Sequence, residues 1–246
     1  KNKCIAILNL GKIEKSKKNL IVFLHGDGSP NSPRPGIPKK SQIRFAKELI
    51  NDDNNIFLFA RPGYFIRERG SSEEDRYSSG PRNAIKSTVV NYDWKNFQIL
   101  VPALQNLKKY YKPKKLILIG HSGGAYQGGT IHGKVPGLVD INILISCPCD
   151  WETRKKLSNG KKWETKSQLK ELKKNSPSFN YKDIDLKSLN ILIVGKDDKN
   201  TAPGVSKYYY DLLKKKKLQV KLHIIDGGHG LRSMPTIGSI IKEYIN

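Results

Sequence analysis

Short apolar runs that alternate with amphipathic stretches are the feature that most constrains the fold of this 246-residue chain. The runs are rich in Ile, Leu, Val and Phe and occupy residues 20–25, 56–60, 116–120, 141–146, 191–195 and 220–226. Continuous apolar runs of this length are typical of strands buried on both faces of a parallel sheet. Between the runs, apolar residues recur at helical spacing over residues 43–50, 94–107, 205–213 and 237–244. The alternation predicts a mostly parallel, doubly wound sheet with helices on both faces.

Two further expectations concern single elements. Residues 4–9 are expected to add an edge strand, and Pro102 is expected to kink the helix over 94–107.

The composition excludes several classes of protein. Apolar residues make up 37% of the chain, which is too many for a disordered protein. The apolar runs are far shorter than the roughly 18 residues of a membrane helix, so no membrane span is expected. Lys and Arg total 45 against 22 Asp and Glu, for a net charge of +23. Because the lysines are spread over the whole chain, we expect a solvated surface and no nucleic-acid partner; a functional basic surface is the alternative.

A nucleophile motif follows the run at 116–120. It reads Gly120-His121-Ser122-Gly123-Gly124, the Gly-x-Ser-x-Gly pattern of a sharp turn from strand to helix. Such a turn holds the serine hydroxyl out at the top of the sheet. The small residues that follow fit a closely packed helix, so Ser122 is the candidate nucleophile.

A serine nucleophile needs a base, and the base needs an orienting acid. Three histidines follow Ser122: His132 at the end of its own helix, His223 inside the last strand, and His229. Only His229 lies in a glycine-rich loop just past a strand end, so it is the candidate base. Two adjacent aspartates after the run at 191–195 compete for the role of the acid.

The order of these groups resembles the α/β-hydrolase superfamily over nearly the whole chain. Members commonly carry the acid three residues after a strand-end Gly, with a Pro five residues further on. Gly195 and Pro203 then select Asp198, with Asp197 as the second choice. The resemblance implies no cofactor and no metal.

An oxyanion hole is also expected, because acyl transfer develops a charge on the carbonyl oxygen. One donor is the N–H of Gly123, the residue after the nucleophile. The segment 24–28, Leu-His-Gly-Asp-Gly, resembles the superfamily's His-Gly signature. By that resemblance the Asp27 N–H is the second donor, and His25 braces the loop.

Two long segments begin at strand ends, where ligands bind in such sheets, and both are candidate pocket walls. Residues 61–87 hold Arg61, Arg67, Arg69, Arg76 and Arg82 among acidic residues, and form either a solvated loop or a wall that binds a substrate carboxylate. Residues 150–187 are Lys-rich and predict a short cap of two or three small helices, within a single domain over 1–246. The candidate wall residues are His121, Tyr64 and Trp151.

The cysteines and the start of the chain leave the compartment open. Cys147 and Cys149 flank Pro148, a spacing that strains a direct disulfide, and Cys4 could pair with either. The chain starts at Lys1, so a signal peptide could have been removed. Cytoplasmic and periplasmic or secreted locations both fit, and the oligomeric state is open.

The function that these groups predict is hydrolysis of a carboxylic ester, small or polymeric, by a serine esterase. Three segments carry a looser likeness: Arg-Pro-Gly-Tyr at 61–64, Pro-Gly-Leu-Val-Asp at 136–140 and Ser-Cys-Pro-Cys-Asp at 146–150. In them the chain resembles prolyl-oligopeptidase and dienelactone-hydrolase types, although the latter use a cysteine where this chain has Ser122. The alternatives are a peptidase or amidase of the same fold, and a non-catalytic binding protein on a hydrolase scaffold.

Overall fold

The computed structural model describes residues 5–27, 40–62, 64, 92–158, 166–230 and 234–245. These residues form one sheet with strand order β1-β3-β2-β4-β5-β6-β7. All neighbouring strands are parallel except β1 and β3. The strands are β1 (Ile7–Leu10), β2 (Asn19–Leu24), β3 (Asn54–Phe59), β4 (Lys115–His121), β5 (Ile141–Ile145), β6 (Leu189–Gly195) and β7 (Gln219–Ile225). The predicted mostly parallel sheet is confirmed, with β1 as an antiparallel edge strand.

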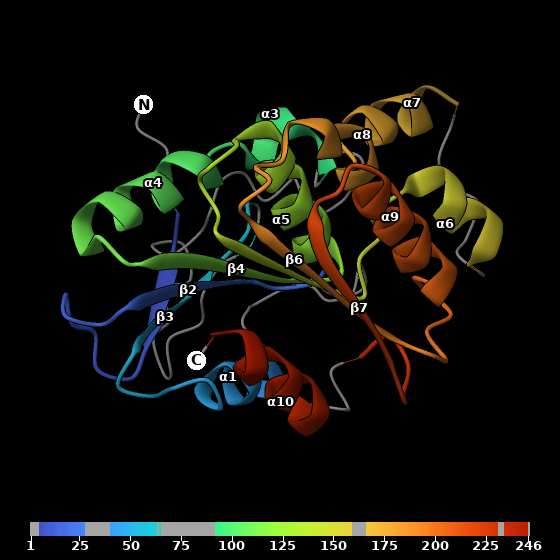
Figure 1. The fold of residues 1–246 in the computed structure, drawn as a ribbon. Helices are drawn as coiled ribbons and strands as arrows, with labels where there is room; N and C mark the ends of the chain where they lie inside the picture. The colour runs from blue at the N-terminus through green and yellow to red at the C-terminus, as the bar shows by residue number, and fades with distance from the viewer. Residues whose placement is uncertain are drawn as a thin grey trace.

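Helices cover both faces of the sheet, with α1 and α10 on one side and α4, α5 and α9 on the other (Figure 1). The helices are α1 (Lys40–Lys47), α3 (Trp94–Phe97), α4 (Leu100–Tyr111), α5 (Gly123–Lys134), α6 (Trp151–Leu157), α7 (Lys166–Lys174), α8 (Pro177–Asn180), the 3₁₀ turn η2 (Tyr181–Asp183), α9 (Pro203–Lys215) and α10 (Met234–Ile245). The doubly wound architecture of the α/β-hydrolase fold is therefore present.

One expected helix is two helices. The stretch 94–107 is interrupted after Phe97 and resumes at Leu100. The expected kink is therefore a full break, at the residue four positions before Pro102, whose carbonyl a proline ring displaces. Pro102 lies in the first turn of α4, where a missing N–H costs no helical hydrogen bond.

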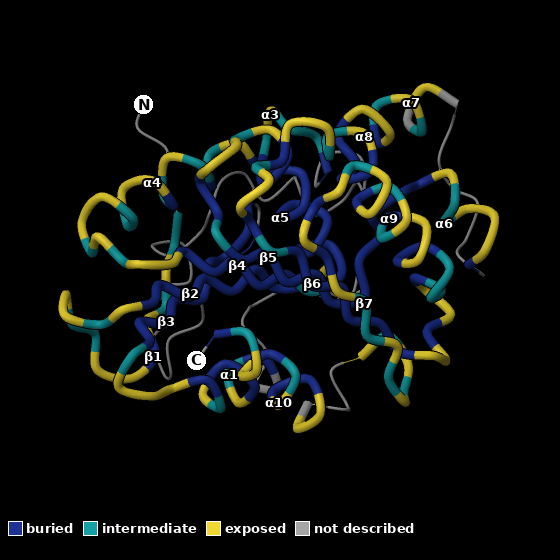
Figure 2. The backbone as a smooth tube through the Cα atoms, viewed as in Figure 1, coloured by how far each residue is buried: buried dark blue, intermediate teal, exposed yellow. Residues whose placement is uncertain are grey.

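The central strands alternate between two apolar layers. In β2, Ile21 and Phe23 pack with α1 and α10, while Leu20, Val22 and Leu24 face the opposite layer. All six residues of β2 are buried, and Figure 2 shows the sheet as the buried centre of the molecule. Alternate side chains of a strand point to opposite faces, so a continuous apolar run serves both layers.

The strand register brings three loops together. Leu24 at the end of β2 pairs with Phe59 of β3 on one side and with Gly120 of β4 on the other. The segments that follow these residues therefore leave the sheet side by side, at its carboxyl edge. This is the edge at which open α/β sheets bind their ligands.

Cys147 and Cys149 form a disulfide in the turn after β5. Their Cα atoms are 5.1 Å apart, within the usual range for a disulfide. The sequence argument disfavoured this pairing, and the correction comes from the local backbone: Ser146 has a φ of 50°, which turns the chain sharply before Cys147. Cys4 lies outside the described residues.

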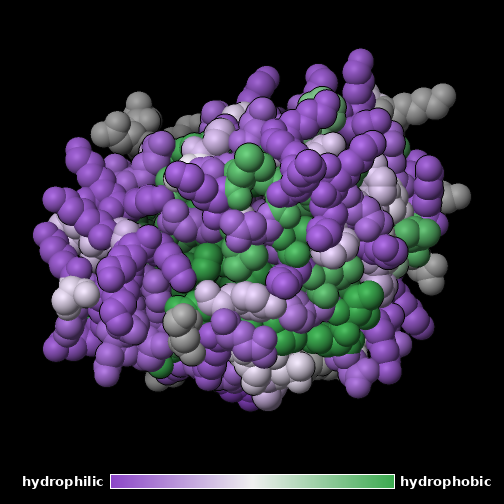
Figure 3. Space-filling view, viewed as in Figure 1, coloured by the Kyte–Doolittle hydropathy of each residue, from purple (hydrophilic) through white to green (hydrophobic). Residues whose placement is uncertain are grey.

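The viewed surface in Figure 3 is mostly hydrophilic, as the charge predicts. Hydrophobic residues gather in the middle of that view, between the upper helices and the lower pair α1 and α10. The edge strand β7 exposes Ile224 to 53%. Within the described parts of the chain, no helix has the length and apolar character needed to cross a membrane.

Candidate active site

Ser122 occupies the tight turn between β4 and α5. Its φ and ψ are 50° and −116°, a conformation that non-glycine residues rarely adopt. The turn is fixed by a 2.8 Å hydrogen bond from the Ser122 N–H to the carbonyl of Ile145 in β5. It also requires Gly124, because a Cβ there would lie 2.1 Å from the carbonyl oxygen of Leu24. The structure thus places Ser122 as a nucleophile elbow predicts.

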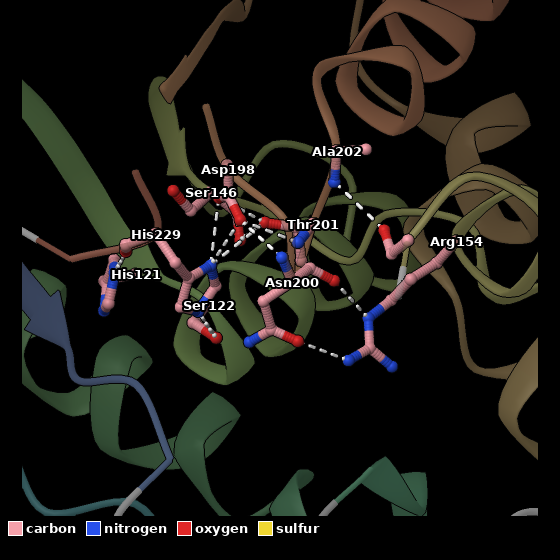
Figure 4. Close-up of polar contacts among 10 residues, drawn as sticks. His121, Ser122, Ser146, Arg154, Asp198, Asn200, Thr201, Ala202 and His229 are labelled. Carbon is pink, nitrogen blue, oxygen red and sulfur yellow. Dashed lines mark hydrogen bonds and ion pairs between the residues drawn. The ribbon is translucent and has the colours of Figure 1, made fainter. Parts of the chain in front are cut away.

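His229 lies between Ser122 and Asp198 (Figure 4). The His229 Nε2 atom is 2.9 Å from Ser122 Oγ, and its Nδ1 atom is 2.9 Å from Asp198 Oδ2. With the Nδ1–H donating to the carboxylate, Nε2 is free to accept the serine proton. These side chains come from the loops after β4, β6 and β7, so the sheet brings together residues far apart in the chain.

The structure distinguishes the two candidate acids. Asp198 is 2% exposed and contacts His229, whereas Asp197 is exposed and uses its N–H to bond the carbonyl of Gly227. Burial acts to raise the pKa of Asp198, but hydrogen bonds and charge from His229, together with hydrogen bonds from Thr201, lower it to about 2.

Thr201 is a site residue that the sequence argument missed. Its N–H donates to Asp198 Oδ1 at 2.8 Å, and its hydroxyl lies 2.7 Å from Asp198 Oδ2 and 3.2 Å from His229 Nδ1. The same hydroxyl is 3.1 Å from the carbonyl of Ser146. Its position three residues after the acid was visible in the sequence, but its contacts with Ser146 and His229 depend on how the loops after β5, β6 and β7 meet.

His121, predicted as a pocket wall, contacts the loop of the base. Its Nε2–H donates to the carbonyl oxygen of His229 at 2.9 Å, and the two ring centroids are 5.4 Å apart. Burial and the neighbouring His229 lower the pKa of His121 to about 4, so the ring is neutral near pH 7. In this structure His121 supports the base.

Tyr64 and Trp151 were also expected to line the pocket. Tyr64 is 1% exposed and packs edge-on against His25, with ring centroids 4.6 Å apart. Trp151 is 3% exposed and packs against Tyr92. Neither presents an open surface to a substrate here.

The expected oxyanion residues lie against one another. A Cβ added to Gly123 would be 2.5 Å from Asp27 Oδ1 and 2.7 Å from Arg61 Nη1. Arg61 is fully buried and forms a 2.8 Å ion pair with Asp27, so both expectations for it, a solvated loop and a substrate-binding wall, are wrong. Arg67, Arg69, Arg76 and Arg82 lie outside the described residues.

The remaining histidines lie elsewhere, as expected. His132 is buried and bonds Ser188, and His223 bonds the hydroxyl of Tyr244. Among the described residues, no group of three His, Cys, Asp or Glu side chains could hold a metal ion.

Comparison with known proteins gives a family and a fold. Residues 51–243 match the model of the prolyl oligopeptidase family. The chain superposes on acylaminoacyl peptidase of Pyrococcus horikoshii with a TM-score of 0.69 and 18% identity, over 99% of this chain and 41% of that one. This chain thus spans about two fifths of that peptidase's length.

Two other solved structures are nearer in length. The Pyrococcus furiosus esterase Pf2001 gives a TM-score of 0.63 at 16% identity, over 99% of this chain and 94% of that one. Est1E from Butyrivibrio proteoclasticus gives 0.64 at 12% identity, over 93% and 87%. Among curated protein sequences, none matches the chain.

Proposed function

The chain belongs to the prolyl oligopeptidase family of serine hydrolases, and from this premise we propose that it hydrolyses carboxylic esters through Ser122, His229 and Asp198. The observation that carries the proposal is the hydrogen-bonded chain from Ser122 Oγ through the His229 ring to Asp198. This arrangement supplies a nucleophile, a base and an orienting carboxylate.

In the proposed reaction, Ser122 Oγ attacks the ester carbonyl while His229 Nε2 takes the hydroxyl proton. The imidazolium then gives that proton to the departing alkoxide, which leaves as the alcohol. The acyl group stays on Ser122 until water attacks it, with His229 again moving the proton. Asp198 keeps its negative charge throughout and stabilises the imidazolium.

The N–H groups of Gly123 and Asp27 are the proposed donors to the oxyanion. Gly123 begins helix α5, whose amino end carries a partial positive charge. The loss of one such donor typically lowers turnover about a hundred- to a thousandfold.

Esters are preferred over peptides as the proposed substrates. Pf2001, a solved structure of similar length, is named as an esterase, whereas the acylaminoacyl peptidase is more than twice as long as this chain. We also propose that residues 150–187 form a short cap within a single domain. In this cap, α6 is bound to the acid loop, which is the segment 196–202 that contains Asp198. Arg154 donates hydrogen bonds to Asn200 at 2.7 and 3.1 Å.

The test compares p-nitrophenyl esters of graded acyl length with peptide p-nitroanilides, using the wild-type protein and Ser122→Ala. Turnover of esters with kcat/KM well above that of the anilides is expected, and it should fall at least about a thousandfold in Ser122→Ala with the fold intact. Anilide turnover that matches or exceeds ester turnover would make the protein a peptidase or amidase. A folded wild type that cleaves neither would be a binding protein.

A further inference from the structure

A buried charge lies directly behind the proposed oxyanion hole. Arg61 follows β3 and is 0% exposed, although a guanidinium group is costly to bury without partners. Its Nη1 donates to Asp27 Oδ1 at 2.8 Å and to the carbonyl of His25 at 3.0 Å. Its Nε donates to Gln127 Oε1 at 3.0 Å. This one side chain therefore connects the loop after β2 with the nucleophile helix α5.

The Arg61 backbone fixes the same loop a second time. The Arg61 N–H donates to His25 Nε2 at 3.0 Å, which leaves His25 Nδ1–H to donate to the carbonyl of Gly26 at 2.7 Å. Burial and the Arg61 charge lower the pKa of His25 to about 3, so the ring stays neutral and keeps both bonds. The segment from His25 to Asp27 is thus held from β3 by side chain and backbone together.

The Asp27 carboxylate is the point where these contacts converge. Besides Arg61, it accepts a hydrogen bond from the Tyr92 hydroxyl and lies 3.4 Å from that of Tyr64. The carboxylate is also packed against Gly123, the other proposed donor. An unpaired negative charge here would oppose an oxyanion, and Arg61 compensates for it.

We propose that the Arg61–Asp27 pair positions the oxyanion hole, by holding the Asp27 N–H at a fixed distance from Gly123 and by neutralising the carboxylate beside it. The inference rests on the proposed function and adds two positioning residues to it. Neither side chain is required to touch the substrate. Because the donors matter most when the oxyanion forms, the pair should affect kcat much more than KM.

The experiment measures kcat, KM and melting temperature for Asp27→Asn and Tyr92→Phe on the best p-nitrophenyl ester. Both changes keep the side-chain shape. Asp27→Asn should lower kcat at least about tenfold and Tyr92→Phe by a smaller factor, with KM changed less than about threefold. Tyr209→Phe is the control, since Tyr209 is equally buried and its hydroxyl has no hydrogen-bond partner among the described residues.

Full kcat in both variants, or a change confined to KM, would overturn the inference. If Asp27→Asn does not fold, Arg61→Lys tests the pair in its place, because it keeps the positive charge but loses the planar guanidinium that bonds Asp27, His25 and Gln127 together. An unchanged kcat in Arg61→Lys would overturn the inference. A fall in kcat as large in Tyr209→Phe would also overturn it. Failure of the proposed function would look different, since the wild type itself would then turn over no ester.

Discussion

The strained backbone of Ser122 fits the role of nucleophile that we propose for it. Its strained conformation is held by the bond to Ile145 and by the close approach of Gly124 to Leu24. The hydroxyl therefore faces His229 in the free protein. The contacts of the folded structure outweigh the strain energy of this backbone conformation.

The first residue-scale prediction separates the two aspartates. Asp198→Asn should lower kcat by about three to four orders of magnitude, because the His229 ring loses its orienting charge. Asp197→Asn is the matched control and should retain nearly full turnover, since that side chain is exposed. Steady-state kinetics on one ester suffices, and the reverse ranking would assign the acid to Asp197.

A second residue-scale prediction concerns Thr201. Thr201→Val keeps the shape but removes the hydroxyl 2.7 Å from Asp198, so kcat should fall about tenfold or more. Thr201→Ser restores the hydroxyl and should return kcat to near the wild-type value. Equal activity in the Val and Ser variants would show that the hydroxyl does not support the acid.

What the sequence could show at this scale follows from distance along the chain. The meeting of Ser122, Asp198 and His229 was predictable because each lies in a short pattern at a strand end, while their catalytic roles stay predictions. The burial of Arg61 was not predictable, because its partners come from the loop after β2 and from α5. We grouped Arg61 with the charged residues that follow it within 61–87. Its place next to the end of a buried strand was the sign that it could be buried.

At the scale of elements, the sequence predicted the strands well because a buried parallel strand is a continuous apolar run. Pro102 predicted a distortion of the helix over 94–107, but the sequence did not show that the distortion is a complete break at 98–99. The disulfide in the turn after β5 was missed for a similar reason: spacing does not reveal the backbone turn at Ser146.

The cap segment gives the element-scale prediction. Helix α6 is held to the acid loop by Arg154 and by Ser158, whose hydroxyl accepts from the Ala202 N–H at 3.0 Å. A lid that swings aside would break these bonds, so α6 should stay in place. We expect rates on a long-chain ester to saturate smoothly through its solubility limit. A jump in rate above that limit, as in lipases with mobile lids, would contradict this.

At the scale of the whole molecule, three buried histidines should make stability depend on pH. Burial lowers the pKa of His25 to about 3 and those of His121 and His132 to about 4. The unfolded chain takes up these protons below about pH 6.5 while the folded protein does not. The folded protein therefore has its full stability with respect to these histidines above about pH 6.5, and it loses stability as the pH falls towards 4.

His132→Gln tests this away from the active site. Between pH 6.5 and 4, the unfolding free energy of the wild type should fall by up to about 3 kcal/mol more than that of the variant. Urea unfolding at pH 7, 6, 5 and 4 measures the slope for both proteins. Identical slopes would show that His132 does not contribute.

The central claim is that Ser122 is the activated nucleophile, and covalent labelling tests it most directly. The folded protein is treated with a fluorophosphonate, and its intact mass and the modified peptide are determined by mass spectrometry. We expect one phosphonyl group per chain on Ser122, no label in Ser122→Ala, and much slower labelling in Asp198→Asn. A label on another serine, or no label on the folded wild type, would contradict the account.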